Sequence, residues 1–189
     1  MQSESEVRSH LPATQGIGKT IRFTGWIAFW LQLGLAVVSG IALLFAATGR
    51  GFTDQPNAGL GVGIFWAVCG VLLLLFNVYW DFRYTRIGKR LANPNAALHP
   101  SKADTTQAIR LGIIISLVGM LLTLLGAGAT LAVLVAKSIS QPPGVAITDP
   151  YNIIRALDVF VMLGNVNAIA AHFVGTVASL WLLEQVHKH

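Results

Sequence analysis

Four long apolar stretches alternate with polar segments along the chain. They are Gly25–Ala47, Gly59–Trp80, Leu111–Ala136 and Val159–Leu183, and none of them contains Asp, Glu, Lys or Arg. Their lengths are 23, 22, 26 and 25 residues, and about 20 apolar residues are enough for a helix to cross the hydrocarbon core of a bilayer. The pattern predicts an all-α integral membrane protein whose four transmembrane helices form an antiparallel up-down bundle.

The same pattern predicts a polar N-terminal tail at 1–24 and one membrane domain at 25–186. We expect the second helix to continue past its apolar run, so that Asp81 and the basic residues after it project into lipid headgroups. Pro94 and Pro100 then disfavour helix in the residues before them. The spans are expected at about 25–47, 59–82, 109–136 and 156–183, with a basic loop at 83–108.

Two features mark the start and the packing face of the third helix. Ser101 with Asp104 three residues later is typical of a helix N-cap. The span itself carries a seam of small residues at alternating steps of four and three, a heptad pattern that allows close backbone approach and a left-handed crossing. We expect this seam to cross the fourth helix closely. Its members are Gly112, Ser116, Gly119, Thr123, Gly126 and Thr130.

The fourth span carries a polar residue at every seventh position: Asp158, Asn165, His172 and Ser179. A step of seven drifts by only about 20° on a straight helix, so these side chains share one face. Polar groups in hydrocarbon cost several kcal/mol unless they are paired, and we therefore expect this stripe to face the bundle or an oligomer axis. Asn167 lies on another face, where it must find a different neighbour or bond to its own helix backbone.

His172 lies near the middle of its span, and two roles remain open for it. Neutral imidazole can bind a divalent metal such as iron, so the stripe, together with Gln32 and Asn77 of the first two spans, could form an ion pathway with His172 as its metal ligand. Alternatively these residues are packing groups that bond across helices, with Gln32 as the expected partner of His172. Asp158 could equally be an interfacial partner of Arg155.

The distribution of positive charge predicts the orientation in the membrane. Of the 13 Lys and Arg residues, 10 fall in the tail, the second loop and the C-terminus, which the positive-inside rule places on the cytoplasmic side together with both chain ends. Aromatic residues gather at the same span ends, as at a membrane interface. We expect four residues after the second span to contact headgroups: Arg83, Arg86, Lys89 and Arg90.

Composition and motifs exclude several classes of function. The chain is 54% hydrophobic and 11% charged, whereas soluble domains average about 25% charged residues. No phosphate-binding glycine loop, zinc-protease motif or nucleophile elbow is present, and the single cysteine, Cys69, has no partner for a disulfide. We therefore expect neither an enzyme nor a nucleic-acid-binding protein, and no cofactor other than a transported divalent metal such as iron.

Three stretches resemble a known family. They are GWIAFWLQLGLAVV, KADTTQAIRLGIIISLVGMLLTLLGAGATLAVLVAKSIS and ALDVFVMLGNVNAIAAHFVGTVASLWLLEQV. The family consists of a small membrane protein of the chloroplast inner envelope, named both as a protein-translocon subunit and as an iron permease, and of its cyanobacterial relatives, a family of unknown function. The matching positions include Gln32, Asp104, Asp158, Asn167, His172 and Gly175.

The resemblance implies a location in a cyanobacterial plasma or thylakoid membrane, or in the equivalent chloroplast envelope. It also leaves two functions open. The first is an oligomeric permease or channel-like component for iron or another divalent cation, with the pathway formed between copies of the chain. The alternative is a non-transporting accessory, assembly or translocon subunit, whose small-residue seams dock other membrane proteins. The two differ in whether a polar cavity or dry packing surrounds His172.

Overall fold

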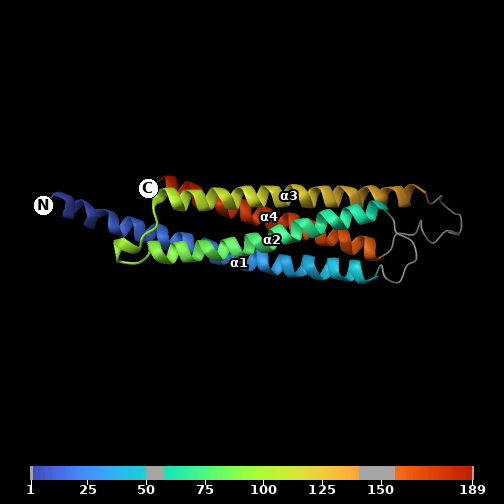
Figure 1. Ribbon diagram of the computed structural model, residues 1–189, viewed down its shortest axis with the longest axis horizontal. Coiled ribbons are helices and arrows are strands. Elements are labelled where there is room, and N and C mark those ends of the chain that lie inside the picture. Colours follow the sequence, from blue (N-terminus) through green and yellow to red (C-terminus); the bar gives the residue numbers. More distant parts are fainter. Residues whose placement is uncertain (1, 50–57, 141–155, 189) are drawn as a thin grey trace. The chain divides into compact units, whose positions relative to one another are not determined.

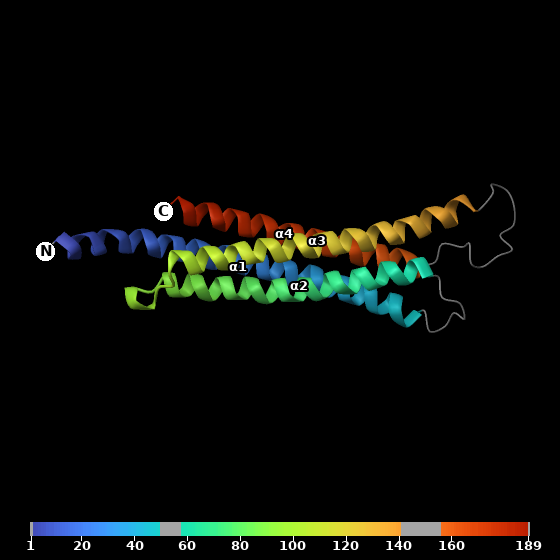
Figure 2. The same ribbon diagram turned by 45° about the horizontal axis from the view of Figure 1, so that its top comes forward.

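The computed structural model describes residues 2–49, 58–140 and 156–188, and this part of the chain is helical with no strand. Figures 1 and 2 show each long helix as one unbroken coil. Each is long and apolar enough to cross a membrane. The expected all-α class with four spans is confirmed. The helices are α1 (Gln2–Gly49), α2 (Ala58–Leu91), α3 (Lys102–Ile139) and α4 (Ala156–His187), with the short 3-10 helix η2 (Ala96–Leu98) between α2 and α3.

The helix ends follow local signals more closely than they follow the apolar runs. Helix α1 already begins at Gln2, within the segment expected to be a polar tail, because polar residues can form the same backbone hydrogen bonds as apolar ones. Helix α2 ends at Leu91, ahead of Pro94. Ser101 caps α3 as expected, because its Oγ accepts a hydrogen bond of 3.0 Å from the Asp104 backbone N–H.

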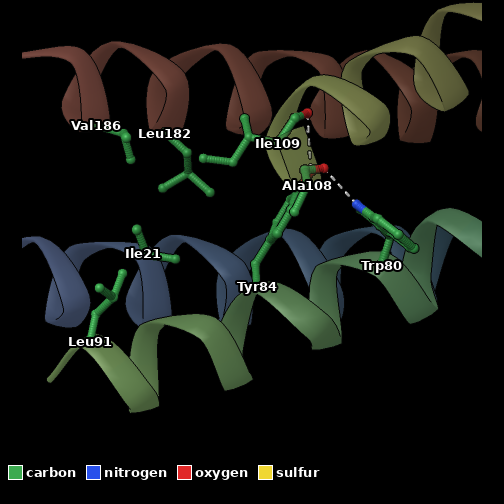
Figure 3. Close-up of a cluster of buried hydrophobic side chains, with 8 residues drawn as sticks. All are labelled: Ile21, Trp80, Tyr84, Leu91, Ala108, Ile109, Leu182 and Val186. Atoms are coloured by element: carbon green, nitrogen blue, oxygen red, sulfur yellow. Dashed lines mark hydrogen bonds between the residues drawn. The ribbon is translucent and has the colours of Figure 1, made fainter. Parts of the chain in front are cut away.

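Each long helix contributes to two compact units. The terminal unit comprises Met1–Leu33, Leu75–Leu117 and His172–His189, and the distal unit comprises Gly34–Leu74 and Val118–Ala171. The terminal unit has an apolar core to which all four helices contribute, shown in Figure 3. This core contains Ile21, Trp80, Tyr84, Leu91, Ala108, Ile109, Leu182 and Val186.

Helices α2 and α3 pack along the predicted seam, whose six members are all buried. In the terminal unit, Tyr84 Oη donates to the Ile109 carbonyl at 3.4 Å, and Asn77 Nδ2 donates to Ser116 Oγ at 2.6 Å. From one contact to the other, the residue on α2 moves back by seven and the residue on α3 moves forward by seven. Opposite steps of one heptad are the register of antiparallel helices.

In the distal unit the seam meets α2 as well as the expected neighbour α4. A methyl group on Gly126 would lie 3.1 Å from both Ala67 N and Gly63 O, which are backbone atoms of α2. The nearest atom of all is a side-chain atom of α4, Asn165 Oδ1, at 2.8 Å. The close backbone approach at Gly126 is therefore with α2, because the glycines of α2 face this part of the seam.

One residue at the end of the second span also differs from its expected place. Asp81 was expected to project into lipid headgroups, but its exposed fraction is 1%, and the neighbouring Trp80 is buried too. The Trp80 indole N–H donates to the Ala108 carbonyl at 2.8 Å (Figure 3). Helical spacing explains the difference, since both residues lie within one turn of the buried Asn77 and Tyr84.

Candidate functional site: a buried polar core

The terminal unit contains a group of polar side chains that are almost completely buried, although they lie in helices of high hydropathy. All four helices contribute to it, because each helix places a polar residue on its inward-facing heptad position. We call this group the polar core. Its members are Gln32, Asn77, Asp81, Ser116, His172 and Ser179, and none is more than 2% exposed.

The first pair of the polar core joins α1 to α2. Gln32 Nε2 donates to Asp81 Oδ2 at 2.6 Å, so the carboxylate expected among lipid headgroups accepts a hydrogen bond inside the bundle. Such a bond is stronger than one between neutral groups when the acceptor is ionised. Among the described residues, Gln32 Oε1 has no hydrogen-bond partner, which leaves one buried acceptor in the core.

The second pair joins α2 to α3, and a glycine of α4 covers both pairs. Asn77 Nδ2 donates to Ser116 Oγ at 2.6 Å. A methyl group on Gly175 would lie 2.6 Å from Asn77 Nδ2, 2.7 Å from Gln32 Nε2 and 2.8 Å from Ser116 Oγ. The backbone of α4 therefore packs directly on these polar atoms at Gly175.

A third contact links α4 to α2 near the apolar core of the terminal unit. Tyr84 Oη and Ser179 Oγ are 3.2 Å apart, within hydrogen-bond distance. His172 lies two turns before Ser179 on the same face of α4 and is completely buried. One turn after His172, Thr176 Oγ1 donates to the His172 carbonyl at 2.9 Å.

The composition of the polar core limits its chemistry. Among the described residues, no group of three or more His, Cys, Asp and Glu side chains is arranged to hold a metal ion. The polar core supplies one imidazole and one carboxylate, and its other polar groups are amides and hydroxyls. Iron, zinc and copper prefer imidazole, thiolate and carboxylate ligands, so this set suits bonding between helices better than binding of a transition metal.

The remaining members of the predicted polar stripe lie in the distal unit. Asp158 forms a buried ion pair with Lys137 of α3, with 2.5 Å between Lys137 Nζ and Asp158 Oδ2. The expected partner, Arg155, lies outside the described residues. Asn165 Nδ2 donates to the Val161 carbonyl at 3.1 Å. The distal part of the stripe therefore connects neighbouring helices and its own backbone.

Asn167, which lies off the stripe, bonds to the backbone of its own helix, the second of the two arrangements expected for it. Its Nδ2 donates to the carbonyl of Leu163 in the preceding turn, at 3.0 Å. A single helix can therefore accommodate this amide near its surface without a partner helix, as side chains that bond back to the preceding turn often do.

Sequence reasoning missed Asp81, Tyr84, Gly175 and Lys137 as residues of these contacts. A usable signal existed in α2, where Asn77, Asp81 and Tyr84 follow one another at steps of four and three, the spacing of one helix face. The charge of Asp81 instead suggested the interface. The four arginine and lysine residues expected at headgroups, Arg83, Arg86, Lys89 and Arg90, are exposed.

Comparison with known proteins gives one family and one curated relative. The family model described as "Protein of unknown function (DUF3611)" matches residues 11–187. "Protein TIC 21, chloroplastic" from Arabidopsis thaliana is 34% identical over 177 residues, which are 89% of this chain and 58% of that protein. The chain thus spans somewhat more than half the length of this relative. No solved structure matches the chain.

Proposed function

The chain belongs to the DUF3611 family of proteins of unknown function, and on that premise we propose that it is a non-transporting subunit of a membrane complex. The complex is of the kind that the resemblance implies, one that moves proteins across a membrane. In this role the chain is a rigid four-helix element that docks other membrane proteins, and its polar core fixes how the helices pack.

The observation that carries the proposal is the pairwise bonding inside the polar core. Gln32 bonds to Asp81, Asn77 bonds to Ser116, and Gly175 packs against atoms of both pairs. An ion pathway needs polar groups that line a space through which the ion can pass and exchange ligands. Polar groups that bond one another between closely packed helices instead specify the helix register.

Docking cannot use the small-residue seam in the way expected from the sequence, because all six seam residues are buried in the chain itself. An exposed apolar groove of about 500 Å³ lies between α1 and α4 of the terminal unit. Its walls combine Phe23, Phe173 and Trp181 with the smaller, half-buried residues Thr24 and Ala178. Small residues on such a surface let the backbone of another helix approach closely, so a cross-linking probe for partners is best placed in this groove.

An oligomeric permease for iron or another divalent cation is the competing function. The observation that favours it is the buried Oε1 of Gln32, an acceptor without a hydrogen-bond partner among the described residues. Uptake of ferrous iron into proteoliposomes separates the two functions. We expect uptake equal to that of liposomes without protein, both for the unchanged chain and for His172→Gln, whose amide retains a donor and an acceptor.

A cross-linking experiment tests the docking role itself. A photo-reactive residue at Val177 in the groove is expected to cross-link to a defined subunit of the protein-translocation machinery, identified by mass spectrometry. The same residue at Val38, an exposed position of α1 outside the groove, is the control and is expected to give no such product. Protein-dependent iron uptake that His172→Gln abolishes, together with no groove-specific cross-link, would overturn the proposal.

A further inference from the structure

Three arginines of α2 line one cavity in the terminal unit. Arg83, Arg86 and Arg90 are separated by three and four residues, the spacing that places side chains on one face of a helix. All three are exposed, and all three line a cavity of about 490 Å³ whose opposite wall includes Asp104 and Thr105 from the first turn of α3.

Two of the guanidinium groups are held in position by aromatic rings. Arg83 Cζ lies 4.4 Å from the centre of the Trp80 ring, and Arg86 Cζ lies 5.0 Å from the centre of the Phe82 ring. The Trp80 ring is itself fixed by its hydrogen bond to the Ala108 carbonyl. Cation–π contacts of this kind restrict the arginine side chains before any ligand arrives, which lowers the entropy cost of binding.

The positive charge of the cavity is only partly neutralised within the described part of the chain. The ion pairs found there involve Lys137 with Asp158 and Lys188 with Glu184, and none involves the three arginines. Asp104 is the acidic residue of the cavity lining, but its Oδ2 accepts a hydrogen bond of 2.6 Å from Ser101 Oγ in the helix cap. The cavity therefore combines three guanidinium groups with one carboxylate.

The cavity also has an apolar side, which narrows the class of ligand. Tyr79, Phe82, Ile87 and Ala108 contribute to its lining next to the arginines, and Tyr79 lies at the end of an apolar run of membrane-spanning length. A ligand that fits both sides has an anionic head and an apolar body. Guanidinium groups bind phosphate oxygens through paired hydrogen bonds.

We propose that this cavity binds one anionic phospholipid. The phosphodiester of the headgroup contacts Arg83, Arg86 and Arg90, and the glycerol and the start of the acyl chains lie against Tyr79 and Phe82. Basic pockets at the ends of transmembrane helices bind anionic lipid headgroups in this way. This site differs from general attraction to a charged surface, because it is saturable and uses arginines on a single helix face.

Charge-matched variants of the whole chain test the proposal. The site variant combines Arg83→Gln, Arg86→Gln and Arg90→Gln. The control variant combines Lys19→Gln, Lys102→Gln and Arg110→Gln, which removes three exposed cations of the same unit that do not line the cavity. Each purified protein is titrated in neutral detergent with phosphatidylglycerol, and bound lipid is counted by native mass spectrometry, with thermal unfolding as a check that the fold is intact.

We expect the unchanged chain and the control variant to bind one phosphatidylglycerol with similar affinity. The site variant should bind about a hundredfold more weakly, since each of the three cations near an anionic headgroup contributes about a factor of five. Titration with inorganic phosphate or glycerol phosphate should give much weaker binding, because neither has the apolar body. The proposal would be overturned if the site and control variants lost the same affinity for phosphatidylglycerol, or if the unchanged chain bound inorganic phosphate as tightly as the phospholipid.

Discussion

At the scale of single residues, the polar core depends on the absence of a side chain at one position. Gly175 lets the α4 backbone lie against Asn77, Gln32 and Ser116, with less than 3 Å between its missing methyl group and a polar atom of each. Real Cβ atoms do not approach polar atoms this closely, so even alanine at this position requires the hydrogen-bonded pairs to move. Glycine here serves packing, since it allows two interhelical bonds and a close helix approach at one place.

Replacing Gly175 by alanine should therefore destabilise the protein by about 1–3 kcal/mol, the usual cost of overpacking a closely packed core. The matched control is Gly34→Ala, since a methyl group there meets nothing within 4 Å and alanine favours helix over glycine by about 1 kcal/mol. Thermal unfolding in detergent checks both. Equal unfolding temperatures for the two variants would show that Gly175 is not tightly packed.

The second prediction at this scale concerns the strength of the hydrogen bond between Gln32 and Asp81. We expect a double-mutant cycle of Gln32→Leu and Asp81→Leu to give a coupling energy of about 1–2 kcal/mol, because the bond is short, at 2.6 Å, and completely buried. Interhelical hydrogen bonds in membranes average less than this. The free energies of unfolding of the four proteins give the coupling, and a value near zero would mean that the two side chains do not interact in the membrane.

At the scale of helices, spacing predicted which face of α3 is buried but named only one of the two helices that this face meets. Every small residue of the seam is buried, from Gly112 to Thr130. The expected neighbour was α4, because one loop connects the two helices, yet the glycine side of α2 supplies the backbone contact at Gly126. In a four-helix arrangement each helix borders two others, and a heptad pattern on one helix does not choose between them.

Substitution of two glycines on α3 tests this packing. Gly126→Leu should force α2 and α3 apart, because backbone atoms of Ala67 and Gly63 lie 3.1 Å from the position of its Cβ. Gly128→Leu is the control on the same helix, since a methyl group at Gly128 meets nothing within 4 Å. We expect the first variant to unfold at a much lower temperature or to be made in reduced amount, and the second to behave as the unchanged chain.

At the scale of the whole molecule, the sequence predicted the fold well because the bilayer imposes a simple rule: each span must be about 20 residues long and lack unpaired charges. The contacts inside were harder to predict. Asp81 and Gln32 are 49 residues apart in sequence, and no periodicity within one helix indicates such a pair. The charges of Asp81 and Lys137 were also a poor guide to exposure. Both residues directly follow apolar runs, yet both are buried, because each has a partner on another helix.

Orientation in the membrane also belongs to this scale and stays a prediction. Ten of the 13 Lys and Arg residues lie in the tail, the second loop and the C-terminus, and cytoplasmic segments carry such an excess. In a Cys69→Ala background, a cysteine replacing Asn95 in the second loop should be protected from a membrane-impermeant thiol reagent added outside sealed cells. A cysteine replacing Thr148 in the third loop should react. After the cells are opened both should react, and a reversed pattern in sealed cells would mean that the chain inserts against its charge distribution.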